Sequence, residues 1–410
     1  MTKQTQRFIK GTLILSIAGM LAKVISVFYK VPLEYLTGTV GLGLYQAVYP
    51  LYSVLTAAAL IGIPNSISKI IAEDIAKKEY RKAHLTFRTG LFLTTGIGLF
   101  ISLFLLIFGK EIVRVFPWDK GTYYVLLGLS ISPAFVGISG AIRGYMQGMQ
   151  EMVPTAVSQI IENTMKVLIG IGLVVIFIKV DASLPITVGG AAFGASAGFI
   201  MATLYLMFVY IRKRPKIRER IESDSHGRSY DRKRILMKIG HIAIPVTIAS
   251  ATFSIMSLID SLTISNFIRG NIEVEGIIVE EASYILGLIA KAQTVINVPL
   301  VLSVSLIINI VPSISAANVQ KDKNELKLKI WEGIDMAIKL ALPAAVGIIV
   351  LAEPILTLLY REGEGAYYLQ LYGISLVLMI LAQSLTGMLQ GLSKYYVPLW
   401  IVFIAAVAKL

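Results

Sequence analysis

The chain contains no cysteine, few histidines and few charged side chains for its length. Without cysteine, disulfide bonds and thiolate metal sites are excluded. The three histidines, His84, His226 and His241, are scattered and show no spacing typical of metal ligands. Charged residues make up only 15% of the 410 residues, whereas a soluble domain averages about 25%. The shortage of charge argues against a soluble globular protein.

Two common sequence signals of catalysis are also missing. The chain has no GxxxxGK[ST] phosphate-binding loop and no HExxH metal-binding helix. The short GLG at 41–43 lacks the rest of a dinucleotide-binding fingerprint. We therefore predict no catalytic residues, no metal and no bound cofactor, and that the protein is not an enzyme.

Apolar residues are abundant and lie in long runs. They make up 56% of the chain, and the mean hydropathy is +0.74. A transmembrane helix needs about 20 predominantly apolar residues, and many of these runs are that long. The alternating ten-residue segments of an outer-membrane barrel are not seen. The sequence thus predicts an all-α polytopic membrane protein.

The apolar runs define the predicted spans and their orientation. Basic loops alternate with mixed or acidic loops, which places the N-terminus in the cytoplasm by the positive-inside rule. The run from 396 to Leu410 has about fifteen residues, too few to cross the membrane, so we expect the chain to be truncated in its C-terminal part. The predicted spans are about 8–30, 43–72, 89–109, 122–145, 154–179, 187–211, 239–268, 283–311, 333–352, 368–392, and one that begins near 396.

A repeated segment indicates that the chain has two related halves. Residues 144–166 recur at 387–409 with a constant offset, so that Gly144, Gln147, Gly148 and Lys166 have counterparts. Between the copies, residues 212–238 hold eleven Lys and Arg against four Asp and Glu, which predicts a cytoplasmic linker. We therefore predict an N-terminal lobe over 1–211 with six spans, the linker over 212–238, and an incomplete C-terminal lobe over 239–410.

Ionisable side chains inside the predicted spans are the best candidates for functional residues, because each is costly at membrane depth. Lys23, Asp260 and Lys291 lie deep within their spans, where they either face a hydrated cavity or form buried pairs. Lys30 lies near the outer end of its span and could instead reach the interface. Asn297 lies on the same span as Lys291.

These residues predict the kind of cargo. Lys23, Lys30 and Lys291 would suit an anionic cargo, with Asn297 as a further substrate-binding residue. Asp260 would balance this charge or bind a coupling cation. Glu162 and Lys166 are four residues apart, so they share a helix face and are a candidate structural pair.

Three segments resemble the stage V sporulation protein B family, which belongs with the lipid II flippase MurJ in the multidrug/oligosaccharidyl-lipid/polysaccharide exporter superfamily. The resemblance covers essentially the whole chain. The segments are AGMLAKVISVFYKVPLEYLTGTVGLGLYQAVYPLY (18–52), IGIPNSISKIIAE (61–73) and RGYMQGMQEMVPTAVSQIIE (143–162). A fourth, NVPLVLSVSLIINIVPSIS (297–315), is similar to the matching eighth-span segment of MurJ-type proteins.

The resemblance implies two pseudo-symmetric six-helix lobes around a central cavity, alternating access, and an undecaprenyl-pyrophosphate-linked cargo. It implies a location in the bacterial cytoplasmic membrane. Lys23 falls where MurJ-type proteins carry an arginine, and Lys30 falls where they carry an acid. Lys291 lies about one turn from their arginine in the eighth span, and the acid expected near 43–45 is missing.

We therefore expect a flippase for lipid II or a related lipid-linked oligosaccharide, acting in peptidoglycan or polysaccharide biosynthesis during growth or sporulation. Sodium ions, protons or the membrane potential would drive transport. The expected partners are the lipid-linked oligosaccharide, membrane lipids and cell-wall enzymes, but no nucleic acid. One alternative is a cation-coupled multidrug exporter of the same fold, and another is a non-transporting scaffold for cell-wall enzymes.

Overall fold

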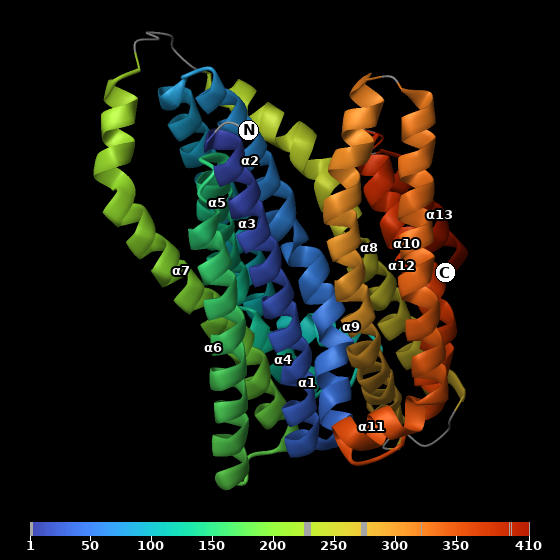
Figure 1. The fold of residues 1–410 in the computed structure, drawn as a ribbon. Coiled ribbons are helices and arrows are strands. Elements are labelled where there is room, and N and C mark those ends of the chain that lie inside the picture. The colour runs from blue at the N-terminus through green and yellow to red at the C-terminus, as the bar shows by residue number, and fades with distance from the viewer. Residues whose placement is uncertain are drawn as a thin grey trace. The chain divides into compact units, whose positions relative to one another are not determined.

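The structure is a computed structural model that describes residues 3–224, 231–271, 277–320, 322–392, 394 and 396–409. Within these residues every regular element is a helix (Figure 1). The helices are α1 (Lys3–Ala57), η1 (Ala58–Gly62, a π-helix), α2 (Ile63–Ala76), α3 (Tyr80–Val115), α4 (Thr122–Leu129), α5 (Ser132–Gly148), α6 (Met152–Lys179), α7 (Leu184–Glu222), α8 (Arg232–Asn271), α9 (Ile277–Gln320), α10 (Lys323–Val350), α11 (Ala352–Tyr360), α12 (Ala366–Gly391) and α13 (Tyr396–Lys409).

Nine of the described segments are long and apolar enough to cross a membrane, and they correspond in order to the second to tenth predicted spans. The all-α polytopic prediction is confirmed. The first predicted span lies within α1, and α13 covers 14 residues. The nine segments are Tyr29–Ala76, Tyr80–Val115, Thr122–Gly148, Met152–Lys179, Leu184–Glu222, Arg232–Ile268, Ala282–Ser303, Lys323–Val350 and Ala366–Leu389.

Several helices differ from the predicted spans at their ends or interiors. A kink at Gly38, where φ is 70° and ψ is 177°, divides α1 into two helices. Glycine suits this position because its positive φ carries no Cβ penalty. The predicted linker is partly helical, since α7 continues to Glu222 through Pro215. With 39 residues, α7 is about 58 Å long at 1.5 Å per residue, so one end projects beyond a hydrocarbon core of about 30 Å.

The chain forms two compact units, which we call unit 1 and unit 2. Unit 1 comprises residues 1–25 and 47–266, and unit 2 comprises residues 26–46 and 267–410. This grouping differs from the division at 212–238 in two places: residues 26–46 belong with the C-terminal helices, and most of α8 belongs with the N-terminal ones.

The core of unit 1 is built where α2, α3, α5, α7 and α8 meet. Ile67 and Ile71 of α2 and Ile239 of α8 are fully buried in it, which explains why α8 groups with this unit. Glycines let α7 lie directly against α6. A Cβ atom added at Gly194 or Gly198 would overlap the backbone of α6, so these small residues set the close approach of the two helices.

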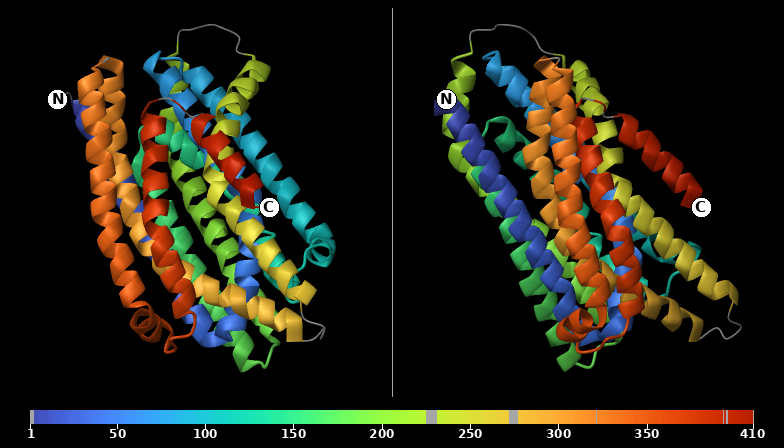
Figure 2. Two further views of the ribbon diagram at one scale, coloured as in Figure 1. Left: turned by 90° about the vertical axis from the view of Figure 1, so that its right-hand side faces the viewer. Right: turned by 45° about the vertical axis from the view of Figure 1, so that its right-hand side comes forward.

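Unit 2 is built around α9, α10 and α12, which lie side by side in both views of Figure 2, coloured orange to red. Ala292 of α9, Ala341 of α10 and Leu376 of α12 are fully buried in its core. Residues 26–46 of α1 contact α9 at glycines. A Cβ atom at Gly43 would overlap the carbonyl oxygen of Ser283, and one at Gly287 would overlap that of Thr39.

Candidate functional site

A buried ion pair joins α1 and α9 within unit 2. The Nζ atom of Lys291 lies 2.6 Å from Oε1 of Glu34, and the two side chains are 0% and 6% exposed. Thr39 donates a hydrogen bond from Oγ1 to the same carboxylate oxygen over 3.3 Å. Removing two charges from water costs several kcal/mol per ion, so each partner needs the other in order to remain buried.

The surroundings of Lys291 include one aromatic ring and a second carboxylate. Its Nζ atom lies 5.3 Å from the ring centroid of Tyr360, within the range of a cation–π interaction. Burial raises the pKa of the Tyr360 phenol, which therefore stays protonated. Glu362 Oε2 is 4.0 Å from Nζ, and its side chain is 59% exposed. The ammonium group is thus buried but lies close to a side chain that reaches water.

A chain of hydrogen bonds lies in the same unit and includes a second lysine. Lys30 donates from Nζ to Gln46 Oε1 over 2.9 Å. Gln46 donates to Gln293 Oε1 over 2.9 Å, and Gln293 donates to the Tyr372 hydroxyl over 3.0 Å. Gln293 is two residues from Lys291 on α9, and residues at this spacing do not share a helix face, so this chain and the Lys291–Glu34 pair are two separate polar contacts between α1 and α9.

Unit 1 has its own cluster of charges at membrane depth. Arg143 of α5 donates from Nη2 to Glu162 Oε2 over 2.7 Å and from Nε to Ser158 Oγ over 2.9 Å. The two charged side chains are 8% and 16% exposed. A guanidinium that reaches two acceptors on one helix fixes α5 against α6.

Polar side chains follow helical spacing along α6. Thr155, Ser158, Glu162 and Lys166 recur at intervals of three or four residues, which places them on one face. Lys166 is buried, and its Nζ atom lies 5.4 Å from the ring centroid of Tyr49. This polar face of α6 is suited to pairing charges or to hydrogen-bonding a polar ligand within unit 1.

Two of the predicted site residues lie in the same unit. Lys30 and Lys291 both lie in unit 2, whereas Asp260 is half-buried on α8 in unit 1. Asn297 is exposed on α9. Lys23 belongs to α1, and its side chain lies outside the described residues. These placements leave the predicted roles in cargo binding and coupling as predictions.

The candidate pair Glu162 and Lys166 has further partners. Glu162 forms its ion pair with Arg143, and Lys166 lies over Tyr49. Arg143 is not among the predicted site residues, although it is an ionisable side chain inside the predicted span 122–145. Glu34 is not among them either, because it falls between two predicted spans.

A serine motif of hydrolases occurs by coincidence in α7. The segment GASAG at 194–198 has the GxSxG pattern, which in hydrolases requires a sharp turn from strand to helix. Here the segment lies inside a helix, and Ser196 is fully buried and donates to the Gly128 carbonyl oxygen over 2.7 Å. It therefore serves the packing of α7 on α4.

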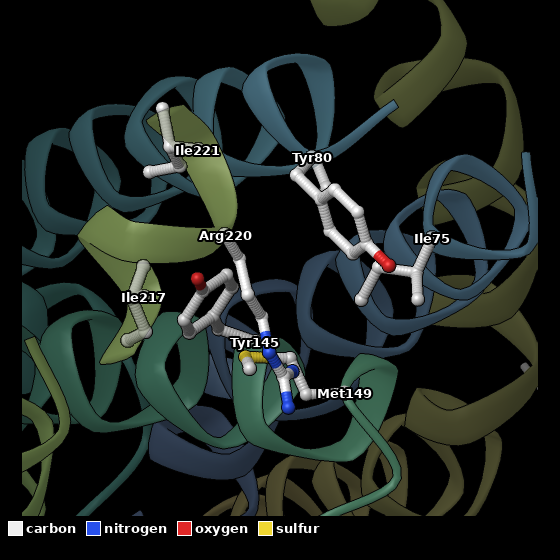
Figure 3. Close-up of a pocket in the computed structure, with 8 residues that line it drawn as sticks. Ile75, Tyr80, Tyr145, Met149, Ile217, Arg220 and Ile221 are labelled. Carbon is white, nitrogen blue, oxygen red and sulfur yellow. The ribbon is translucent and has the colours of Figure 1, made fainter. Parts of the chain in front are cut away.

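A small pocket lies where α2, α3, α5 and the projecting end of α7 meet in unit 1 (Figure 3). The Arg220 side chain passes the Tyr145 ring and extends toward Met149. None of the predicted site residues lines this pocket, which combines apolar walls with one guanidinium. Its lining residues are Ile75, Tyr80, Ala83, Tyr145, Met149, Ile217, Arg220 and Ile221.

The described residues contain no group of three His, Asp or Glu side chains that could hold a metal ion.

The fold is that of a membrane transporter superfamily. The chain matches the inward-facing structure of a multidrug resistance MATE family transporter of the MOP superfamily with a TM-score of 0.76, at 16% identity, over 97% of this chain and 88% of that one. A MOP superfamily transporter from Pyrococcus furiosus matches with a TM-score of 0.67, at 17% identity, over 99% and 88% of the two chains. At these identities the likeness defines the fold. The protein is a multi-pass membrane protein with the MOP-superfamily fold.

The chain belongs to the Polysaccharide biosynthesis protein family, which it matches over residues 8–318. Among proteins of Bacillus subtilis, it is 28% identical to the uncharacterized membrane protein YabM over 93% of this chain and 69% of that protein. It is 25% identical to stage V sporulation protein B over 96% and 74%. It is 24% identical to the lipid II flippase MurJ over 99% and 76%.

Proposed function

We propose that this protein is a flippase that moves an undecaprenyl-pyrophosphate-linked saccharide, lipid II or a related precursor, across the bacterial cytoplasmic membrane. The carrying observation is the match to MurJ, a relative named as a lipid II flippase, which extends over 99% of this chain. The match to stage V sporulation protein B and the family itself support the same class of cargo. The protein would act as a transporter without catalysing a covalent reaction.

Cationic side chains at membrane depth support an anionic cargo. A pyrophosphate group that links a lipid to a saccharide carries about two negative charges. Hydrogen bonds from an ammonium group to such an anion are roughly twice as strong as hydrogen bonds between neutral groups. Lys291 and Lys30 would hold the pyrophosphate, together with Lys23 and the amide of Asn297. Replacing such a lysine by glutamine removes the charge, whereas arginine retains it.

Transport would proceed by alternating access, with the N-terminus in the cytoplasm. Cargo binds one conformation better than the other and so shifts the population between them. The coupling cation, Na⁺ or H⁺, would bind at Asp260, or the membrane potential would drive the step. Enzymes of cell-wall synthesis would supply and consume the cargo.

Complementation of cells depleted of their lipid II flippase tests this proposal. The full-length protein should restore growth, and so should Lys291→Arg. Lys291→Gln should not restore growth at the same protein level in the membrane. Growth restored equally by wild type and by the double variant Lys23→Gln and Lys291→Gln would contradict the cationic site.

The multidrug-exporter alternative is distinguished by drug resistance. The fold neighbours include a multidrug transporter, but the buried Lys291 of unit 2 favours an anionic cargo over the cationic compounds that an acidic pocket would take. Cells that express the protein should therefore show no gain in resistance to cationic drugs. The scaffold alternative instead predicts that growth is restored by variants that lack the buried lysines.

A further inference from the structure

The ion pair between Lys291 and Glu34 balances charge but leaves the hydrogen bonding of the ammonium incomplete. Although the two charged atoms are 2.6 Å apart, no acceptor among the described residues meets hydrogen-bond geometry at the Nζ atom of Lys291. An ammonium group has three N–H donors, and a buried donor without an acceptor costs free energy. Lys291 is 0% exposed, so bulk solvent does not reach the ammonium group.

This geometry fits a counter-ion that can be displaced better than a permanent ion pair that holds the two helices together. A carboxylate that fixes two helices would be expected to accept well-aligned hydrogen bonds from its partner, as Glu162 does from Arg143. Glu34 instead balances the charge of Lys291 without accepting a well-aligned hydrogen bond from it. The hydrogen bond that the Glu34 carboxylate does accept comes from Thr39. A ligand with several anionic oxygens would satisfy both the charge and the N–H donors of Lys291.

The site is also close to water. Glu362, at 4.0 Å from the same Nζ atom, has a side chain that is 59% exposed. A side chain that reaches solvent thus lies 4.0 Å from the buried ammonium, and because Glu362 is exposed, water screens its charge too strongly for it to replace Glu34 as the main counter-ion.

We propose that Glu34 is an internal counter-ion that occupies the anion site of Lys291 when cargo is absent, and that the pyrophosphate group of the cargo displaces it. The inference rests on the proposed function, because it takes the cargo to be a pyrophosphate lipid. Glu34 lies on the α1 segment that belongs to unit 2, so its displacement would remove the ion pair that joins that segment to α9. Cargo binding and the movement of α1 would thus be coupled.

Competition gives the expected size of the effect. If the internal pair is formed in about 90% of molecules, the apparent affinity for a competing anion is about tenfold weaker than the intrinsic affinity. Removing the competing carboxylate should therefore strengthen binding, which is the opposite of what loss of a supporting residue would do.

The experiment measures binding of undecaprenyl pyrophosphate to the purified full-length protein in nanodiscs. Glu34→Gln should bind about tenfold more tightly than wild type. Glu34→Asp, which retains the charge but shortens the side chain, should fall between them. Lys291→Gln should lose most of the binding. Asp335→Asn is the control and should bind as wild type does, because Asp335 is exposed on α10, where it pairs with Lys339.

Equal or weaker binding by Glu34→Gln and Glu34→Asp would overturn the inference, as would normal binding by Lys291→Gln. If Glu34→Gln does not fold, Glu34→Asp decides: tighter binding than wild type supports the inference, and equal or weaker binding overturns it.

The proposed function can fail separately. If the variants bind as expected but the protein does not rescue flippase-depleted cells, the role of Glu34 as a counter-ion is supported and the flippase function is contradicted. If the protein rescues the cells but Glu34→Gln binds as wild type does, the flippase function is supported and the counter-ion role is contradicted.

Discussion

Charged side chains within the membrane-spanning helices lie in clusters in both units. Arg143 with Glu162 and Lys291 with Glu34 are each more than four-fifths buried. A buried pair contributes little net stability compared with an apolar pair, but removal of one partner is costly because it leaves an uncompensated charge. Single-site variants should therefore be strongly destabilised at Arg143 and Glu162, where the two charges are joined by a hydrogen bond.

For unit 1 we predict that Arg143→Gln destabilises the protein by roughly 3–5 kcal/mol, because Glu162 then remains as a buried anion. Unfolding in mixed micelles with increasing denaturing detergent measures this change. Glu222→Gln is the control, since its pair with Arg218 is exposed and should contribute no resolvable stability. Equal unfolding midpoints for Arg143→Gln and wild type would show that the buried pair is not required.

For Asp260 we predict that Asn impairs transport while insertion into the membrane stays normal. A carboxylate in a spanning helix is expensive unless it is paired, hydrated or protonated, and an amide of the same shape cannot carry its charge. Growth of flippase-depleted cells across a range of pH and sodium concentrations gives the measurement. Wild-type growth in every condition would remove Asp260 from the mechanism.

The lysines at membrane depth could be predicted from sequence, but their partners could not. Lys30 and Lys291 are visible because each interrupts an apolar run. Glu34 lies in the connection between two predicted spans, where a carboxylate is expected to be hydrated at no free-energy cost and is therefore not a candidate site residue. Only the kink at Gly38 and the packing of α1 on α9 bring it to Lys291.

At the scale of elements, hydropathy predicts the membrane-embedded part of a helix better than its ends. The second to tenth spans correspond to nine long apolar segments. In contrast, α7 continues for eleven residues into the predicted linker, because polar residues such as Arg and Glu are good helix formers once they are in water. The break between α4 and α5 falls within one predicted span, near Pro133, and has no signal in hydropathy.

The contact between α1 and α9 yields a prediction about glycine. Gly43→Ala and Gly287→Ala should each destabilise the protein by about 1–3 kcal/mol, because the added methyl group overlaps a carbonyl oxygen of the facing helix. Gly347→Ala on α10 is the matched control. Nothing lies within 4 Å of its added Cβ atom, so alanine should be neutral or stabilising by up to about 1 kcal/mol.

Thermal unfolding of the purified variants provides the measurement. A close contact of the two backbones is excluded if Gly43→Ala and Gly287→Ala unfold at the same temperature as Gly347→Ala.

At the scale of the whole molecule, the positive-inside rule predicts the orientation. Ser183 and Ser223 are exposed residues that flank the two ends of α7, and the chain has no native cysteine. In intact cells an impermeant thiol reagent should label Ser183→Cys, whereas Ser223→Cys should react only after the membrane is permeabilised. Labelling of Ser223→Cys alone in intact cells would reverse the orientation.

The proposed function depends on the identity of the cargo. Only membership of the family and similarity to the named relatives point to a specific cargo. The sequence predicts an anionic cargo from the positions of its lysines, because charge at membrane depth is rare and therefore informative. It does not distinguish lipid II from another pyrophosphate-linked saccharide, since both present the same charged group to the site.

Translocation by the purified full-length protein in liposomes is the most direct test of the central claim. A fluorescent undecaprenyl-pyrophosphate-linked saccharide is incorporated in both leaflets, and an added impermeant quencher reports the fraction that reaches the outer leaflet over time. We predict that wild type and Lys291→Arg expose the inner-leaflet pool, and that Lys291→Gln leaves it protected, as in protein-free liposomes. Equal protection with wild type and with protein-free liposomes under imposed sodium, proton and voltage gradients would contradict the account.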